Sequence, residues 1–153
     1  QCIFQDPYSS LNPRMSAGEN ITYGLKIHKL IDKNNAKSLA QDLMSLVGLK
    51  REDADKLPHA FSGGERQRIG IARALGYRPD FIFCDEPTSA LDLNSEQSFV
   101  ERLKEFLVDT TLITITHRLP VLELVDRIIV MADGKIALDG PKSEVLEKLQ
   151  GKQ

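Results

Sequence analysis

The chain has 153 residues, of which 41% are hydrophobic and 27% are charged, and its formal net charge is -2. This length accommodates one hydrophobic core and is short for two ordinary domains. The small net charge gives no reason to expect nucleic acid as a partner, and no apolar run approaches the roughly 18 residues that span a bilayer. Composition therefore predicts a soluble globular chain that reaches a membrane only through a partner.

The cysteines indicate the redox compartment of the protein, and the first residue indicates that the chain is part of a larger unit. Cys2 and Cys84 both lie in apolar runs, which favours reduced core thiols in a cytoplasmic protein. The chain begins with Gln1 rather than Met, and residues 1–4 already have the pattern of a strand. We therefore expect it to be the later part of a larger unit.

The first half of the chain is predicted to be mostly helical. A strand over residues 1–4 leads into a loop over 5–13 that is rich in turn-forming residues, and long loops in compact domains are usually functional or mobile. Apolar periodicity and a terminal Gly48 define the helices that follow. These helices are expected over 17–28, over 35–47 and, after a charged linker at 50–56, from Ser62 to Arg78.

The second half alternates strands with helices, which indicates a parallel sheet built from crossover units. Residues 81–85 form a short continuous apolar run, typical of a strand buried on both faces. Asn94 and Ser95 can cap the next helix, and Asp133-Gly134 is a strong hairpin signal. The other expected elements are a helical face over 99–107, a strand over 110–116, hairpin strands over 125–132 and 135–138, and a helix over 141–149.

Two acids follow the strand at 81–85, at the sheet edge where parallel α/β proteins bind ligands. Asp85 is placed to hold Mg²⁺, usually through water, and Glu86 to polarise the water that attacks a γ-phosphate. Taken alone, the pair is explained equally well as solvated acids at the end of a strand.

Three further motifs are ambiguous by themselves. Ser62-Gly63-Gly64-Glu65 has the spacing of a helix capping box, while its two glycines leave backbone N–H groups bare for an incoming phosphate. His117 follows the strand at 110–116, and Gln5 opens the long loop. A histidine in a turn and a glutamine in a loop are ordinary, although an amide can ligate Mg²⁺ or orient water.

In combination these motifs resemble the ATP-binding cassette (ABC) ATPase domain over nearly the whole chain. The matches, in order, are Gln5 to the Q-loop, Ser62 to Gln67 to the signature, Asp85-Glu86 to the Walker B strand and catalytic Glu, Ser89 to Asp92 to the D-loop, and His117 to the switch His. The resemblance implies an α/β, P-loop NTPase-like core with a mostly parallel sheet, truncated at its N-terminus. Residues 17–77 then form a helical signature subdomain, and 1–16 and 78–153 the remaining core.

The resemblance also implies ATP and Mg²⁺ as cofactors. Asp85 is expected to support Mg²⁺, and Gln5 to sense Mg²⁺ and water while its loop touches a membrane subunit. Glu86 is expected to be the general base, and His117 to contact the γ-phosphate and the attacking water.

Members of the family pair head to tail, so that one subunit's signature faces the nucleotide of its partner. In this chain Ser62, Gly63 and Gly64, with Glu65 beside them, are expected to serve ATP held by a second ABC ATPase domain. Asp92 is expected to couple the two sites. Transmembrane subunits are the other implied partners, and the chain is expected at the cytoplasmic side of the membrane as a peripheral component.

The chain departs from the family pattern in two places. Phe61 and Glu65 replace the usual Leu and Gln of the signature, and the phosphate-binding motif G-x-x-x-x-G-K-[ST] does not occur in the 153 residues. The lysine and backbone amides of that loop hold the β- and γ-phosphates. We therefore expect the isolated chain not to hydrolyse ATP and to expose a sheet edge.

The subfamily signals disagree. Residues 4–15 and Phe61 resemble the oligopeptide, dipeptide and nickel importer branch, whereas Arg118 after His117 and residues 125–130 are more similar to exporters and type I secretion ATPases. The Q-loop favours a peptide importer, with an exporter as the alternative. A non-transport ABC ATPase is disfavoured because 57 residues separate Gln5 from Ser62 without sustained heptads. A non-catalytic partner subunit remains open.

Overall fold

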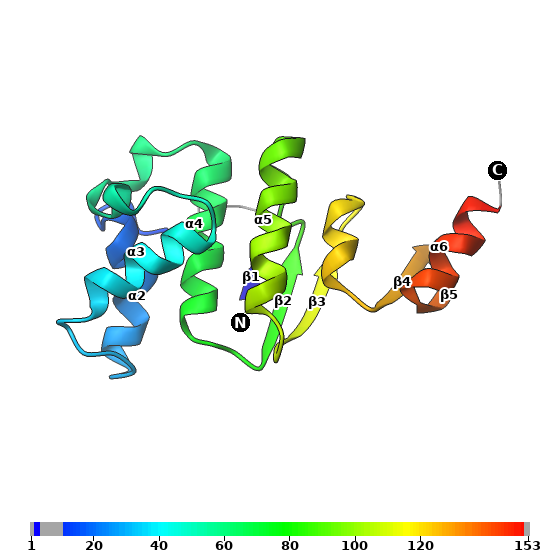
Figure 1. The fold of residues 1–153 in the computed structure, drawn as a ribbon, viewed down its shortest axis with the longest axis horizontal. Helices are drawn as coiled ribbons and strands as arrows, with labels where there is room; N and C mark the ends of the chain where they lie inside the picture. Colours follow the sequence, from blue (N-terminus) through cyan, green and yellow to red (C-terminus); the bar gives the residue numbers. More distant parts are fainter. Residues whose placement is uncertain (1, 4–10, 152–153) are drawn as a thin grey trace.

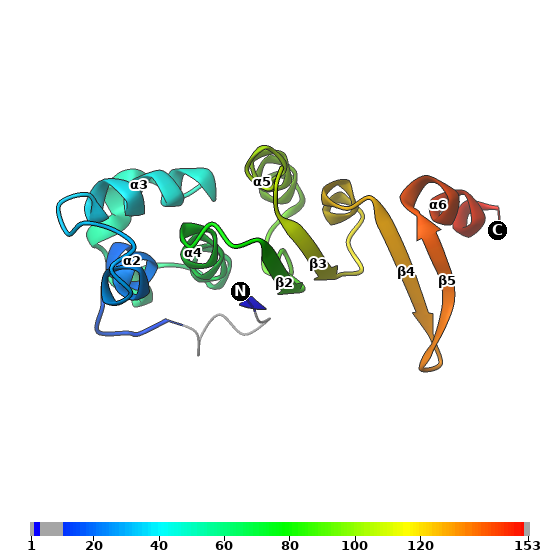
Figure 2. The same ribbon diagram turned by 90° about the horizontal axis from the view of Figure 1, so that it is seen from below.

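The computed structural model describes residues 2–3 and 11–151 (Figure 1). Its N-terminal helices lie together at one end, a parallel sheet occupies the middle, and a hairpin with the last helix lies at the other end (Figures 1 and 2). The elements, in order, are β1 Cys2–Ile3, α2 Ala17–Ile27, α3 Ala36–Leu46, η1 Arg51–Asp55, η2 Pro58–Ala60, α4 Gly63–Gly76, β2 Phe81–Asp85, α5 Leu93–Phe106, β3 Thr111–Ile115, η3 Pro120–Leu124, β4 Arg127–Ala132, β5 Lys135–Pro141 and α6 Lys142–Gln150.

The sheet in the middle has the order β1-β2-β3, and both pairs of strands are parallel. Phe81 lies opposite Thr111 and Asp85 opposite Ile115, so β2 and β3 end at the same edge. The chain crosses from β2 to β3 through α5, as parallel neighbours require. The predicted parallel sheet is therefore confirmed, and it brings the residues after β2 and β3 close together.

Among the described residues, helices cover one face of the sheet and leave the other face exposed. Ile82 and Cys84 point toward α4 and α5 and are buried, and Cys84 is a free cysteine as predicted. On the opposite face Phe81 is 44% exposed and Ile113 is 47% exposed. The expectation that residues 81–85 are buried on both faces is therefore wrong for the described residues, because no described helix packs below the sheet (Figure 2).

Helices α2, α3 and α4 pack against one another beside the sheet. Buried Asn20 fixes the entry to α2, because its side chain accepts from the N–H of Asn12 at 2.8 Å and donates to the carbonyls of Asn12 and Met15. The chain from the predicted Q-loop thus enters this cluster in a defined position. The boundaries 17–77 of a separate helical subdomain stay a prediction.

The hairpin forms as predicted, with Asp133 and Gly134 both at positive φ, 49° and 72°. Strand β5 continues to Pro141, so the last helix starts one residue later than expected. The cap predicted at Asn94 or Ser95 is wrong. Asp92 caps α5 instead, accepting from the N–H of Ser95 at 3.0 Å.

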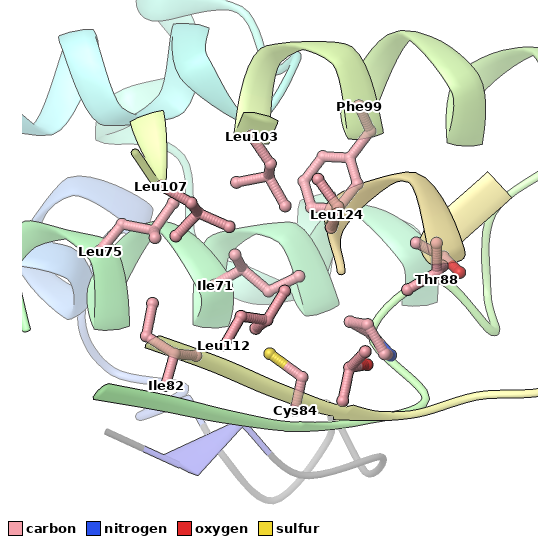
Figure 3. A pocket seen from close by; sticks show the side chains of 13 residues that line it. Ile71, Leu75, Ile82, Cys84, Thr88, Phe99, Leu103, Leu107, Leu112 and Leu124 are labelled. Atoms are coloured by element: carbon pink, nitrogen blue, oxygen red, sulfur yellow. The ribbon is translucent and has the colours of Figure 1, made fainter. Parts of the chain in front are cut away.

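A cavity of about 20 Å³ lies between the sheet and helices α4 and α5 (Figure 3). Its lining is mostly apolar, with Ile71 from α4, Phe99 from α5 and Ile82 from β2 facing one another. The Oγ1 atom of Thr114, which also lines it, is buried and has no hydrogen-bond partner among the described residues. A buried hydroxyl without a partner destabilises a fold.

Thr114→Val is therefore expected to raise the free energy of unfolding by about 1 kcal/mol, because it removes the unsatisfied hydroxyl while nearly keeping the side-chain shape. Urea denaturation of the natural protein that carries these residues measures the change. The matched control is Thr116→Val, whose hydroxyl accepts from the N–H of Arg118 at 3.1 Å and which should therefore gain nothing. Equal effects of the two substitutions would contradict the assignment.

Candidate functional site

The site begins at Glu86, the first residue after β2. Its φ is +49°, a left-handed conformation that a glutamate rarely adopts. The turn is held because the Glu86 N–H donates to the carbonyl of Ile115, the last residue of β3, at 2.9 Å. Strain of this kind is common where a side chain must be aimed for function.

This turn places the Glu86 carboxylate against His117. The two side chains meet with Glu86 Oε1 and His117 Nδ1 2.7 Å apart. They come from neighbouring parallel strands, 31 residues apart in sequence. The glutamate side chain is 16% exposed and the histidine 78%, so the pair has a shielded member and a member open to solvent. The structure thus brings together the two residues that the sequence singled out as catalytic.

The second carboxylate oxygen of Glu86 is an acceptor without a donor. Oε2 is buried and has no hydrogen-bond partner among the described residues. A buried carboxylate oxygen without a donor is costly to a fold, so it is a feature that function has to explain. Asp85 precedes it at the end of β2 and is partly buried.

This donor set fits Mg²⁺ bound jointly with a nucleotide. Mg²⁺ is usually held by one or two carboxylates together with substrate phosphates and waters. Within residues 2–3 and 11–151, no three His, Cys, Asp or Glu side chains converge into a metal cage. Asp85 is the residue here that can hold the ion.

The signature motif lies at the start of α4, where it forms a complete capping box. Ser62 Oγ accepts from the N–H of Glu65 at 3.3 Å, and Glu65 Oε2 accepts from the N–H of Ser62 at 2.8 Å. That N–H, with help from the Ser62 hydroxyl, lowers the pKa of the Glu65 carboxyl, which favours its ionised form. The cap holds the positive end of the helix in place beside Gly63 and Gly64.

Gly64 lies against the segment that follows Glu86. A Cβ atom at Gly64 would come within 2.5 Å of the carbonyl oxygen of Ala90. From the same helix, Gln67 donates through Nε2 to the carbonyl of Glu86 at 2.9 Å. The signature helix therefore touches the turn that carries the acids.

Sequence reasoning missed the contacts that hold this turn, in which Gln67 donates to Glu86 and Arg118 donates to the carbonyls of Ser89 and Leu91 and contacts Glu96. From the sequence, Arg118 is only a subfamily signal, similar to exporters. One signal was available for Glu96, which is fully buried: it falls on the apolar face of α5, one turn before Phe99. A carboxylate on that face predicts a buried partner.

The predicted site residues fall into two groups and two single residues. Asp85, Glu86 and His117 meet at the carboxyl edge of the sheet, and Ser62 to Glu65 form the start of α4. Asp92 is the cap of α5 and ends the segment between the two groups. Gln5 lies outside the described residues. The roles of all of them in binding and catalysis stay predictions.

The fold is that of the ATP-binding cassette class. Among solved structures, a dimeric ATP-binding cassette, MJ0796, bound to ADP and Pi matches with a TM-score of 0.81 and 28% identity, over 92% of this chain and 61% of that one. The ABC transporter family model matches residues 1–89. The chain belongs to this family.

Curated relatives of the chain are ATP-binding proteins of peptide transport. The oligopeptide transport ATP-binding protein OppF of Bacillus subtilis is 46% identical over 151 residues, which are 96% of this chain and 50% of the relative. The probable D,D-dipeptide transport ATP-binding protein DdpF of Escherichia coli is 44% identical over 95% of this chain and 48% of its own length. The chain thus spans about half the length of these relatives.

Proposed function

We propose that these residues belong to the ATP-hydrolysing subunit of an ABC importer for peptides or similar solutes. The observation that carries the proposal is the contact of Glu86 with His117, 2.7 Å, beside a buried carboxylate oxygen that has no donor. The relatives named for oligopeptide and dipeptide transport favour peptides as the solute. They also favour the importer branch over the exporter alternative.

Each residue of the site has a distinct task in hydrolysis. Glu86 takes a proton from the attacking water, and the contact of its Oε1 with His117 keeps the carboxylate aimed. His117 donates to the Glu86 carboxylate through Nδ1, and when the ring is doubly protonated its Nε2 donates toward the γ-phosphate. Mg²⁺, when bound at Asp85 with the nucleotide, neutralises charge on the β- and γ-phosphates. For Gln5, which lies outside the described residues, we propose the role that the family resemblance implies, sensing Mg²⁺ and water.

The second half of each site comes from a partner domain in this proposal. Ser62, Gly63 and Gly64 present a capped helix start, a preferred anion site, to ATP held by a second ABC ATPase domain. A dimeric solved cassette supports this arrangement. Asp92 lies at the end of the connecting segment and couples the two sites.

Transmembrane transporter subunits are the remaining partners, with this chain peripheral at the cytoplasmic face of the membrane. Within the described residues, no helix combines the length and the apolar character needed to cross a bilayer. The motif G-x-x-x-x-G-K-[ST] does not occur in these 153 residues, which span about half the length of the relatives, so every test below uses the natural protein that carries them.

The proposal is tested by the Mg²⁺ requirement of ATP hydrolysis. Removing Mg²⁺ with EDTA is expected to stop phosphate release, and Asp85→Asn is expected to raise the Mg²⁺ concentration for half-maximal rate roughly tenfold, because a neutral amide attracts the ion less strongly. The matched control is Asp80→Asn, which changes an exposed aspartate just before the opposite end of β2. Hydrolysis that persists without Mg²⁺, or equal shifts in both variants, would contradict the proposed site.

A further inference from the structure

Residues 86–92, which we call the clamp loop, are held from two sides by parts of the chain far away in sequence. On one side Gln67 of α4 donates to the Glu86 carbonyl at 2.9 Å and lies 3.5 Å from Ser89 Oγ. Gln67 is 3% exposed, so these bonds are shielded from water. The clamp loop is thereby tied to the helix that begins with the signature.

On the other side the clamp loop is held by Arg118, the residue after the switch histidine. Its guanidinium donates to the Ser89 carbonyl through Nη2 and to the Leu91 carbonyl through Nη1, both at 3.0 Å. Two bonds from one rigid, planar group fix the loop in direction as well as in distance. Arg118 therefore connects the segment of His117 directly to the loop that begins with Glu86.

A buried carboxylate keeps Arg118 in this position. Glu96 of α5 is fully buried, and its Oε2 lies 3.3 Å from Arg118 Nη1. Its Oε1 accepts from the hydroxyl of Thr88, itself in the clamp loop. Both oxygens of Glu96 are thus engaged, one by the arginine and one by the loop that the arginine holds. A buried charge with these partners orders its surroundings because losing either contact is costly.

We infer that Arg118 is a positioning residue, which sets the clamp loop between the signature helix and the switch histidine and so keeps Glu86 against His117. The inference rests on the proposed ATPase function. Gln67 and Gly64 of the signature helix contact the loop on one side, and Arg118 fixes its other side, so that Glu86 is held in place between them.

Arg118→Lys in the natural protein separates positioning from stability. Lysine keeps the positive charge beside Glu96 but cannot donate to two carbonyls in a fixed plane. We expect the midpoint of thermal unfolding to stay close to that of the unsubstituted protein, kcat for Mg-ATP to fall at least about tenfold, and KM to change less than about twofold, because misaligned catalytic groups lose rate rather than binding. The matched control is Arg127→Lys, which alters an exposed arginine with two bonds of 2.8 Å to Asp139, and no change in kcat is expected there.

A double variant that removes both buried charges also separates the positioning role of Arg118 from its contribution to stability. Arg118→Met alone leaves Glu96 unpaired and is expected to lower the unfolding midpoint by roughly 5–10 °C. Adding Glu96→Gln should recover most of that loss without recovering kcat. If the double variant regains both, Arg118 has only a structural role and the inference is overturned.

Amide hydrogen exchange tests whether Arg118 holds the clamp loop, without relying on ATP hydrolysis. The N–H of Ser89 bonds to Glu86 and that of Leu91 to Thr88, at 3.2 and 2.9 Å, and both are expected to exchange at least about tenfold faster in Arg118→Lys than in Arg127→Lys. Equal exchange in the two variants overturns the inference, and so does faster exchange with an unchanged kcat. If the unsubstituted protein itself does not hydrolyse Mg-ATP, the proposed function fails, and the exchange rates alone decide whether Arg118 holds the loop.

Discussion

Glu86→Gln is expected to lower steady-state ATP turnover at least about 100-fold, because the amide that replaces the carboxylate cannot take a proton from water. Glutamine keeps the size of the side chain and preserves the turn at positive φ, which depends on the backbone bond to Ile115. ATP binding should therefore survive while hydrolysis stops. With the nucleotide retained at the dimer interface, the variant is expected to accumulate as an ATP-bound dimer.

Two measurements on the natural protein test this expectation. Phosphate release gives the turnover, and gel filtration with Mg-ATP shows the dimer, which should appear with Glu86→Gln and fall apart with the unsubstituted protein as ATP is consumed. Glu101→Gln, at an exposed position on α5, is the matched control and should leave both unchanged. Turnover at the normal rate in Glu86→Gln would contradict the assignment of Glu86 as the general base.

That Asp85, Glu86 and His117 lie at one edge of the sheet could be predicted, because these residues stand at the ends of strands that the apolar pattern identifies. Asp85 and Glu86 come directly after an apolar run, and His117 comes two residues after the next strand. In a parallel sheet those ends meet, whatever the details of packing. The 2.7 Å contact of Glu86 with His117 depends in addition on a left-handed turn at a glutamate, which no local pattern encodes.

The clamp loop could not be predicted in the same way, because its contacts join side chains to backbone carbonyls across three segments. Local sequence indicates that Gln67 lies on a helix and that Arg118 follows a strand, but not which carbonyls they reach. The cap of α5 shows the same limit on a smaller scale. Asp92, Asn94 and Ser95 are all good capping residues, and only the path of the chain after the loop selects Asp92.

The prediction of buried strands failed for a different physical reason. An apolar run such as Phe81 to Asp85 shows that both faces of the strand are suited to burial. Each face becomes buried only where another element packs against it. Helices α4 and α5 supply one such face, and among the described residues the other face has none. Exposed Ile129 and Met131 on β4 have apolar surface of the same kind.

His117→Ala is the second substitution with a large expected effect, a fall of about 100-fold in kcat. Removing one well-placed donor from a site where charge develops typically costs 10²–10³ in rate. The imidazole is 78% exposed, so alanine should change the unfolding midpoint little, and the loss of rate is then a loss of chemistry. His59→Ala, at an exposed histidine in η2, is the matched control and should keep full turnover.

Combining the two substitutions shows whether Glu86 and His117 act as one unit. Groups that work together in one step are strongly non-additive, so the second loss costs little once the first has occurred. His117→Ala added to Glu86→Gln should therefore lower the residual turnover only a few fold, far less than the about 100-fold expected when Glu86 is intact. Fully multiplicative losses, measured by phosphate release under single-turnover conditions, would mean that the 2.7 Å contact plays no part in the reaction and that each residue acts alone.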